Sequence, residues 1–159
     1  MVREILLLGN EALYQISAPV TDCEDVSAVI ADLHDTLMDF RQTHGFGRAI
    51  AAPQIGVHKR IIYLYLDKPT VFINPTLEFL DGETMEVLDD CMSFPGLWVK
   101  VRRYRRCRIR YLDALRQPQT LLLEGDLSEL LQHEYDHLDG ILSTMRAVDG
   151  RSFVLTSRS

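Results

Sequence analysis

The sequence predicts an α+β fold: a single domain over residues 1–159 with two helices and a set of mostly antiparallel strands. Two segments, near residues 26–40 and 127–138, repeat apolar residues at three- and four-residue intervals, as a helix with one buried face does. Turn-forming residues separate runs rich in β-branched and aromatic residues, at 60–66, 70–74, 76–80, 99–111 and 120–124.

The composition excludes several classes of protein. A hydrophobic fraction of 47% with 25% charged residues is typical of a globular domain, and the net charge of −6 argues against direct DNA binding. No apolar run approaches the roughly 20 residues of a membrane span, and the N-terminus lacks a secretory cleavage site. The three cysteines form an odd, sparse set that indicates a reducing compartment. We therefore expect a cytoplasmic monomer that does not associate with membranes.

The first third of the sequence predicts an extended start, one helix and a loop. Residues 1–10 form an early strand or extended segment, and Pro19 breaks regular structure between residues 13 and 20. A helix follows, ending near Thr43, with its cap at Asp22, Asp25 or Ser27. The next segment, 45–56, is dense in small residues, which permit close approach of the backbone to another group. A tight loop would explain its glycines equally well.

Strands are predicted through the middle of the chain. Residues 60–66 and 70–74 are bounded by Pro69 and Pro75, and residues 76–80 extend into another strand before a turn at Asp81-Gly82. In 99–111, apolar residues alternate with basic ones, which predicts strands with one buried face. The basic residues of segment 100–110 then form a solvated strand face or, alternatively, a basic patch for an RNA-rich partner such as a ribosome. The polar end from residue 149 predicts a short mobile tail.

The second helix carries the pattern H-E-x-x-H. His133 and His137 are four residues apart, so a helix places both imidazoles on one face, with Glu134 beside them. This pattern is typical of a metal site with a carboxylate base. The alternative is two helix histidines that only pack or face solvent. Helix signals flank the motif, with Gly140 as a left-handed end and an N-cap at Asp126 or Ser128.

Two histidines do not complete a catalytic metal site, which uses three protein ligands and leaves a position for water. Cys91 is the candidate third ligand, because a thiolate binds zinc or iron(II) well and a bound cation holds it deprotonated. For Cys23 and Cys107 we expect buried structural roles. Glu134 would take the proton of the water and later deliver it to the departing amine.

Three segments together resemble the peptide deformylase family. They are Ala51-Ala52-Pro53-Gln54, Asp89-Asp90-Cys91-Met92-Ser93 and Gln132-His133-Glu134-Tyr135-Asp136-His137. The family carries G-x-G-x-A-A-P-Q, E-G-C-x-S and H-E-x-D-H stretches in this order, and the resemblance extends over nearly the whole chain. It implies a fold in which mostly antiparallel sheets wrap a central metal-binding helix and the N-terminal helix lies outside.

The resemblance also implies an activity: metal-dependent hydrolysis that removes the N-formyl group from the N-terminal methionine of newly made polypeptides and releases formate. By resemblance, Gln54 and the backbone N–H of Met92 stabilise the negative charge that grows on the formyl oxygen. Iron(II) would be the working metal in the cell, with zinc or nickel able to occupy the site. Arg103 also fits the family and would pair with Asp89 to fix the cysteine loop.

The match departs from the family in the loops. Gly47 aligns with the first loop glycine, but Ala49 replaces the second, Arg48 replaces an apolar residue and Asp90 replaces the glycine before the cysteine. By resemblance, these four residues line the channel where the peptide substrate binds as an added strand. Arg48 and Asp90 would pair with each other or recognise a charged substrate. An alternative function is therefore hydrolysis of a different formylated peptide or small amide.

Two further alternatives follow from the motifs. A non-catalytic protein that binds formylated N-termini would not need every chemical residue, yet all are present here. An endopeptidase of the H-E-x-x-H type would use His or Glu as third ligand, whereas Cys91 points away from that class.

Overall fold

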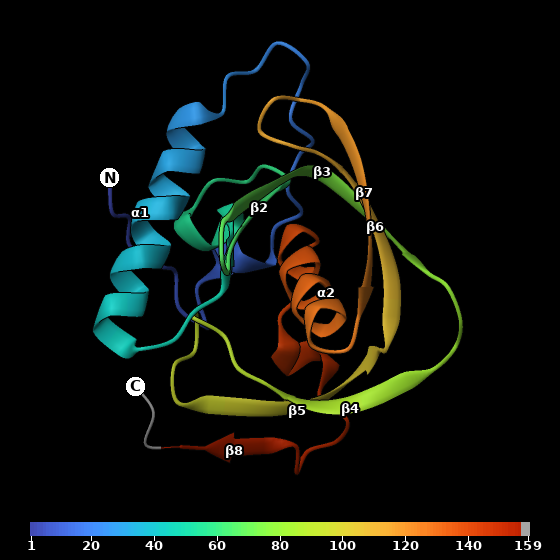
Figure 1. The fold of residues 1–159 in the computed structure, drawn as a ribbon. Coiled ribbons are helices and arrows are strands. Elements are labelled where there is room, and N and C mark those ends of the chain that lie inside the picture. The colour runs from blue at the N-terminus through green and yellow to red at the C-terminus, as the bar shows by residue number, and fades with distance from the viewer. Residues whose placement is uncertain (157–159) are drawn as a thin grey trace.

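The computed structural model describes residues 1–156, and its two antiparallel sheets surround one helix (Figure 1). The helices are α1 (Ser27–His44) and α2 (Asp126–Leu138), with short 3-10 helices η1 (Glu11–Tyr14), η2 (Ala52–Ile55) and η3 (Ser143–Arg146). The strands are β1 (Ala49–Ala51), β2 (Ile61–Tyr65), β3 (Pro69–Phe79), β4 (Thr84–Asp89), β5 (Leu97–Tyr104), β6 (Arg106–Leu112), β7 (Pro118–Glu124) and β8 (Phe153–Leu155).

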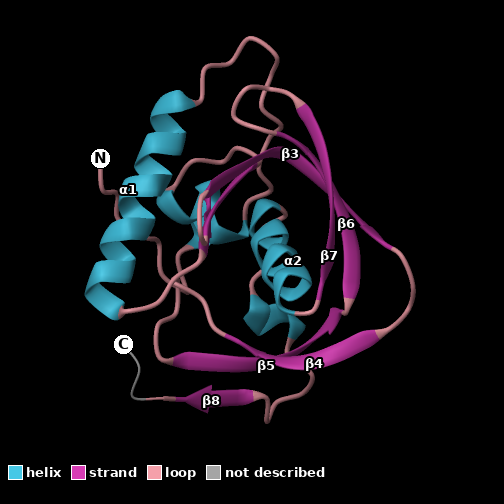
Figure 2. Cartoon of the chain, in the orientation of Figure 1, coloured by secondary structure: helices cyan, strands magenta, loops and turns pink. Residues whose placement is uncertain are grey.

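The larger sheet has the order β1-β2-β3-β6-β7 and the smaller has the order β4-β5-β8, and every neighbouring pair is antiparallel. Helix α2 lies in the interior, with the larger sheet curving around it and β4 and β5 closing the other side (Figures 1 and 2). Helix α1 lies on the outside of this arrangement. The predicted α+β class, the central helix and the outer N-terminal helix are therefore confirmed.

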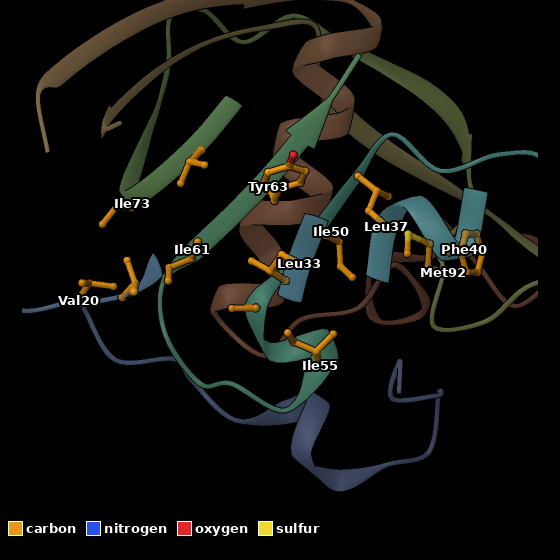
Figure 3. Close-up of a cluster of buried hydrophobic side chains, with 13 residues drawn as sticks. Val20, Leu33, Leu37, Phe40, Ile50, Ile55, Ile61, Tyr63, Ile73 and Met92 are labelled. Atoms are coloured by element: carbon orange, nitrogen blue, oxygen red, sulfur yellow. The ribbon is translucent and has the colours of Figure 1, made fainter. Parts of the chain in front are cut away.

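Helix α1 packs on the sheet through the apolar face that its periodicity predicts. Leu33 and Leu37 are fully buried, and Phe40 is nearly so, in a cluster with residues of β1, β2 and η2 (Figure 3). Burial of each such side chain contributes roughly 1.5–3 kcal/mol. None of the three predicted caps holds the N-cap position, which is Val26, and no side chain caps the start. The Asp25 carboxylate instead accepts hydrogen bonds from the backbone N–H and the hydroxyl of Ser27 just before the first turn.

Helix α2 begins differently from the prediction. Gly125, with φ +62, holds the N-cap position, Asp126 is already the first helical residue, and no side chain caps the start. The hydroxyl of Ser128 donates instead to the carbonyl of Tyr104 at the end of β5. The predicted end is confirmed, since Gly140 has φ +72. A Cβ there would lie 2.4 Å from the carbonyl oxygen of Tyr14, so the position requires glycine.

Two strand predictions were wrong in detail. Pro75 does not end a strand, because β3 runs continuously from Pro69 to Phe79 and its register with β6 shifts between Ile73 and Thr76, at the proline. Asn74 there has φ +50, and its side chain bonds both backbone groups of Val20. The segment before the cysteine loop, for which no strand was predicted, forms β4 against β5.

The C-terminal segment is also more ordered than predicted. Instead of a mobile tail, residues 153–155 form β8, which pairs with β5 from Leu97 to Val99. The last part of the predicted tail, 157–159, lies outside the described residues. Within residues 1–156, no helix combines the length and the apolar character needed to cross a membrane.

Candidate metal centre and active site

The three predicted metal ligands meet at one point inside the protein. Cys91 lies in the loop after β4, and His133 and His137 lie one turn apart on the inner face of α2. One ligand atom from each falls within 4.8 Å of the others, and all three residues are buried. The Cys91 Sγ is 3.4 Å from the His137 Nε2. A thiolate and two imidazoles at this spacing fit a tetrahedral site for zinc or iron with one open position.

A buried ionic network orients the ring of His133, whereas the Nδ1 of His137 has no hydrogen-bond partner among the described residues. The Nδ1 of His133 lies 3.0 Å from Asp89 Oδ2 and 3.0 Å from the hydroxyl of Ser143, so its Nε2 is left for the centre. Burial opposes ionisation of Asp89, but His133 and Arg103 outweigh it and hold its pKa below the usual range. Burial and the neighbouring His133 lower the pKa of His137, which favours the neutral ring that a metal needs.

Arg103 links the cysteine loop to α2. Its guanidinium donates to Asp89 Oδ2 at 2.8 Å and to Asp136 Oδ2 at 2.7 Å, and the Arg103 side chain is only 3% exposed. The predicted pairing of Arg103 with Asp89 is therefore confirmed, and Asp136 joins it. Arg146, in η3, binds the two carboxylate oxygens of Asp136 at 2.6 and 3.0 Å.

Glu134 lies beside the metal ligands with one carboxylate oxygen unused. It is buried, and its Oε1 has no hydrogen-bond partner among the described residues. Burial raises the pKa of Glu134 to about 7, against the opposing effect of His133. A carboxyl group with a pKa near neutrality both accepts and returns a proton readily, which suits a general acid–base role.

Gln54 is positioned from η2 toward the same centre. Its Nε2 lies 3.5 Å from Cys91 Sγ and 3.1 Å from Ser93 Oγ, while its Oε1 accepts from the backbone of Ala51. The N-terminal segment runs alongside, since Leu6 N–H donates to the carbonyl of Gln54. Met92 follows Cys91 in the cysteine loop and is buried.

A cleft of about 630 Å³ opens onto this centre, and the predicted loop residues Gly47, Arg48, Ala49 and Asp90 all line it. Gly47 has φ +126, and a Cβ would lie 3.2 Å from Phe40, so glycine is needed. Ala49 lies in β1 opposite Leu64 and does not have positive φ, so strand geometry accepts its side chain.

Arg48 forms an ion pair with Asp126, which the sequence did not predict. Its guanidinium lies 2.7 Å from Asp126 on the first turn of α2, 78 positions later in the chain. Of the two cysteines expected to be buried, Cys107 is buried but Cys23 is exposed. Sequence reasoning also missed Ser143, Arg146 and Glu129. Glu129 stands four residues before His133, and that spacing was the available signal that it shares the helix face lining the cleft.

Comparisons with known proteins agree with this geometry. Residues 2–152 match the family model described as polypeptide deformylase. Peptide deformylase 1 of Prochlorococcus marinus (strain MIT 9313) is 36% identical over 169 residues, covering 98% of this chain and 85% of the relative. Peptide deformylase 2 of Clostridium perfringens (strain 13 / Type A) is 35% identical over 149 residues, covering 92% of this chain and 93% of the relative.

Solved structures show the same fold. The peptide deformylase from Synechococcus elongatus, in complex with actinonin, superposes with a TM-score of 0.85 at 31% identity, covering 93% of this chain and 80% of the other. The peptide deformylase from Thermotoga maritima gives a TM-score of 0.84 at 28% identity, covering 94% and 99%. The chain therefore belongs to the polypeptide deformylase family, as its three motifs predict.

Proposed function

We propose that the chain removes the N-formyl group from the N-terminal methionine of newly made polypeptides and releases formate. The observation that carries this proposal is the grouping of Cys91, His133 and His137 within reach of one ion, with the unpartnered Glu134 carboxylate oxygen beside them. Family membership supports the same reaction.

Each residue of the centre has a separate role in the proposed reaction. Cys91, His133 and His137 would hold one divalent cation, which supplies a Lewis acid that makes water a nucleophile near neutral pH. Glu134 takes a proton from the water whose oxygen bonds to the formyl carbon. As the carbon–nitrogen bond breaks, Glu134 returns that proton to the amine. Gln54 Nε2 and the backbone N–H of Met92 would donate to the formyl oxygen while it carries negative charge.

We propose iron(II) as the metal in the cell, with zinc or nickel as ions that also occupy the site. One thiolate and two imidazoles suit both iron(II) and zinc, so the donor set supports a divalent transition metal without selecting one. Glu134 would remain the base with either ion, because its position is fixed by α2.

The substrate would enter through the cleft, where Gly47, Arg48, Ala49 and Asp90 line the path to the centre. We propose that the protein works as a cytoplasmic monomer. The contact of segment 100–110 with a ribosome stays a prediction. Ion pairs to carboxylates reduce the free positive charge of that segment, and they involve Arg102, Arg103, Arg105, Arg106, Arg108 and Arg110.

The test is formate release from formyl-Met-Ala-Ser by protein purified anaerobically with iron(II). We expect turnover that Glu134→Gln reduces by about 10²–10⁴-fold, while the variant keeps its metal. Metal analysis of both proteins is the matched control. Absence of release from protein with a full metal site would contradict the proposal and direct the search to another formylated peptide or small amide.

A further inference from the structure

A second cavity lies between α1 and the larger sheet, separate from the cleft at the metal centre. It has a volume of about 800 Å³, and no residue that lines it also lines the cleft. Strand β6 ends at Leu112, opposite Ile73 of β3, so residues 69–72 of β3 reach past its end. The cavity occupies this corner of the sheet, since Pro69, Thr70 and Val71 all line it.

The walls of this cavity are mostly apolar and aromatic. Helix α1 contributes Ile30, Ala31 and His34 from one face, Tyr63 comes from β2, and Tyr111 comes from the end of β6. The Tyr63 hydroxyl lies 2.6 Å from His34 Nδ1, and the two rings meet edge to face with 5.7 Å between their centroids. Rings held in this way offer fixed aromatic surfaces to a flat ligand, and the volume suits a small molecule.

The two carboxylates in the walls already have partners. Asp35 binds the amino group of Met1. Asp113 accepts hydrogen bonds from two backbone N–H groups, both at 2.9 Å, and from the side-chain amide of Gln119 at 3.1 Å. A cationic ligand would therefore have to displace existing contacts to reach either carboxylate.

Three polar side chains of the walls are free, and each of them can donate a hydrogen bond. Among residues 1–156, no hydrogen bond or ion pair engages the Lys68 ammonium, the Thr70 hydroxyl or the Tyr111 hydroxyl. Burial raises the pKa of Tyr111, and Asp113 adds to the rise, so this hydroxyl remains a donor near neutral pH. Because the free groups are donors and one of them is a cation, they suit an anion.

We propose that this cavity is a second binding site, which takes a flat aromatic carboxylate. The ring of the ligand would pack against Ile30, Tyr63 and Tyr111, and its carboxylate would accept hydrogen bonds from Lys68 and the Tyr111 hydroxyl. An uncharged amide of the same shape would keep the apolar contacts and lose the charge contact. The inference is independent of the proposed function, because the cavity shares no residue with the cleft.

The matched probes are 2-naphthoate and 2-naphthamide, which have the same ring system and differ in charge. Isothermal titration calorimetry with the metal-loaded protein measures both dissociation constants. We expect 2-naphthoate to bind about tenfold more tightly, the size of one hydrogen bond to a charged group. Lys68→Met should remove this difference. Lys100→Met should keep it, because Lys100 is an exposed lysine on β5 that lines neither the cavity nor the cleft.

A second variant tests the apolar part of the site. Ala31 is exposed on α1 and lines the cavity, so Ala31→Trp places an indole there without changing a buried residue. Both probes should then lose their binding. Ala28→Trp is the control, because Ala28 is exposed on the same helix but does not line the cavity.

Several results would overturn the proposal. Equal dissociation constants for the two probes, or no binding of 2-naphthoate up to millimolar concentration, would contradict it. An equal loss of affinity in Lys68→Met and Lys100→Met would do the same. If a chelator that removes the metal also abolishes 2-naphthoate binding, the ligand binds at the metal centre and the second site fails. Formate release tests the proposed function separately from all of these measurements.

Discussion

Replacement of Arg103 by methionine would remove the cation that joins the cysteine loop to α2. Arg103 is 3% exposed and lies between two carboxylates, Asp89 at 2.8 Å and Asp136 at 2.7 Å. Asp136 would keep Arg146, but Asp89 would lose its arginine partner while staying buried, at 4% side-chain exposure. Asp89 would keep its contacts with His133 and Ser143 but lose its only guanidinium partner among the described residues. Breaking a buried ion pair costs up to about 3–5 kcal/mol, and we expect the loss here to approach the lower end of that range.

The assay is urea unfolding of Arg103→Met beside Arg102→Met, its neighbour on β5. Arg102 is 60% exposed and pairs with Glu86 at 3.3 Å, so we expect its loss to cost less than about 1 kcal/mol. Because Asp89 also orients His133, Arg103→Met should weaken metal binding by about 10–100-fold. Equal free energies of unfolding for the two variants would refute the structural role given to Arg103.

Three further perturbations have defined outcomes. Gln54→Ala should lower kcat for formate release by about 10²–10³-fold with the metal retained, since one donor to the formyl oxygen is lost; unchanged kcat would remove Gln54 from the reaction. Gly140→Ala should lower the free energy of unfolding by more than about 1 kcal/mol, because Gly140 has φ +72 and an added Cβ would lie 2.4 Å from the carbonyl oxygen of Tyr14. Gly150→Ala should change the free energy of unfolding little, because no atom lies within 4 Å of an added Cβ there. Removal of the metal by a chelator should abolish turnover and lower Tm, and re-addition of the metal should restore both. At a free-metal concentration 100-fold above Kd, metal binding should stabilise the folded protein by about 2.7 kcal/mol.

The sequence predicts the chemical centre well because its residues lie in short local patterns. The spacing of His133 and His137 on a helix fixes their relation before any tertiary contact is known. Cys91 and the Arg103–Asp89 pair follow from motif order and from the family resemblance. Helix α1 is predicted to within a residue of its C-terminal end because its buried face repeats regularly.

The features that the sequence does not predict depend on partners far along the chain. Strand β8 is exposed along its length, so no burial pattern marks it, and only pairing with β5 defines it. The same holds for the hydrogen bond of Ser143 to His133 and for the Arg48–Asp126 ion pair. Arg103 is a different case, since it shares the inward face of β5 with Val99 and Val101, and a charge there is stable only with buried carboxylates.

The central claim is that Cys91, His133 and His137 hold the catalytic metal, and X-ray absorption of the zinc-loaded protein tests it most directly. We predict one zinc per chain with one sulfur ligand at about 2.3 Å and nitrogen or oxygen ligands at about 2.0–2.1 Å. Cys91→Ala should lose the sulfur shell. A zinc shell of nitrogen and oxygen alone in the unaltered protein would contradict the site described here.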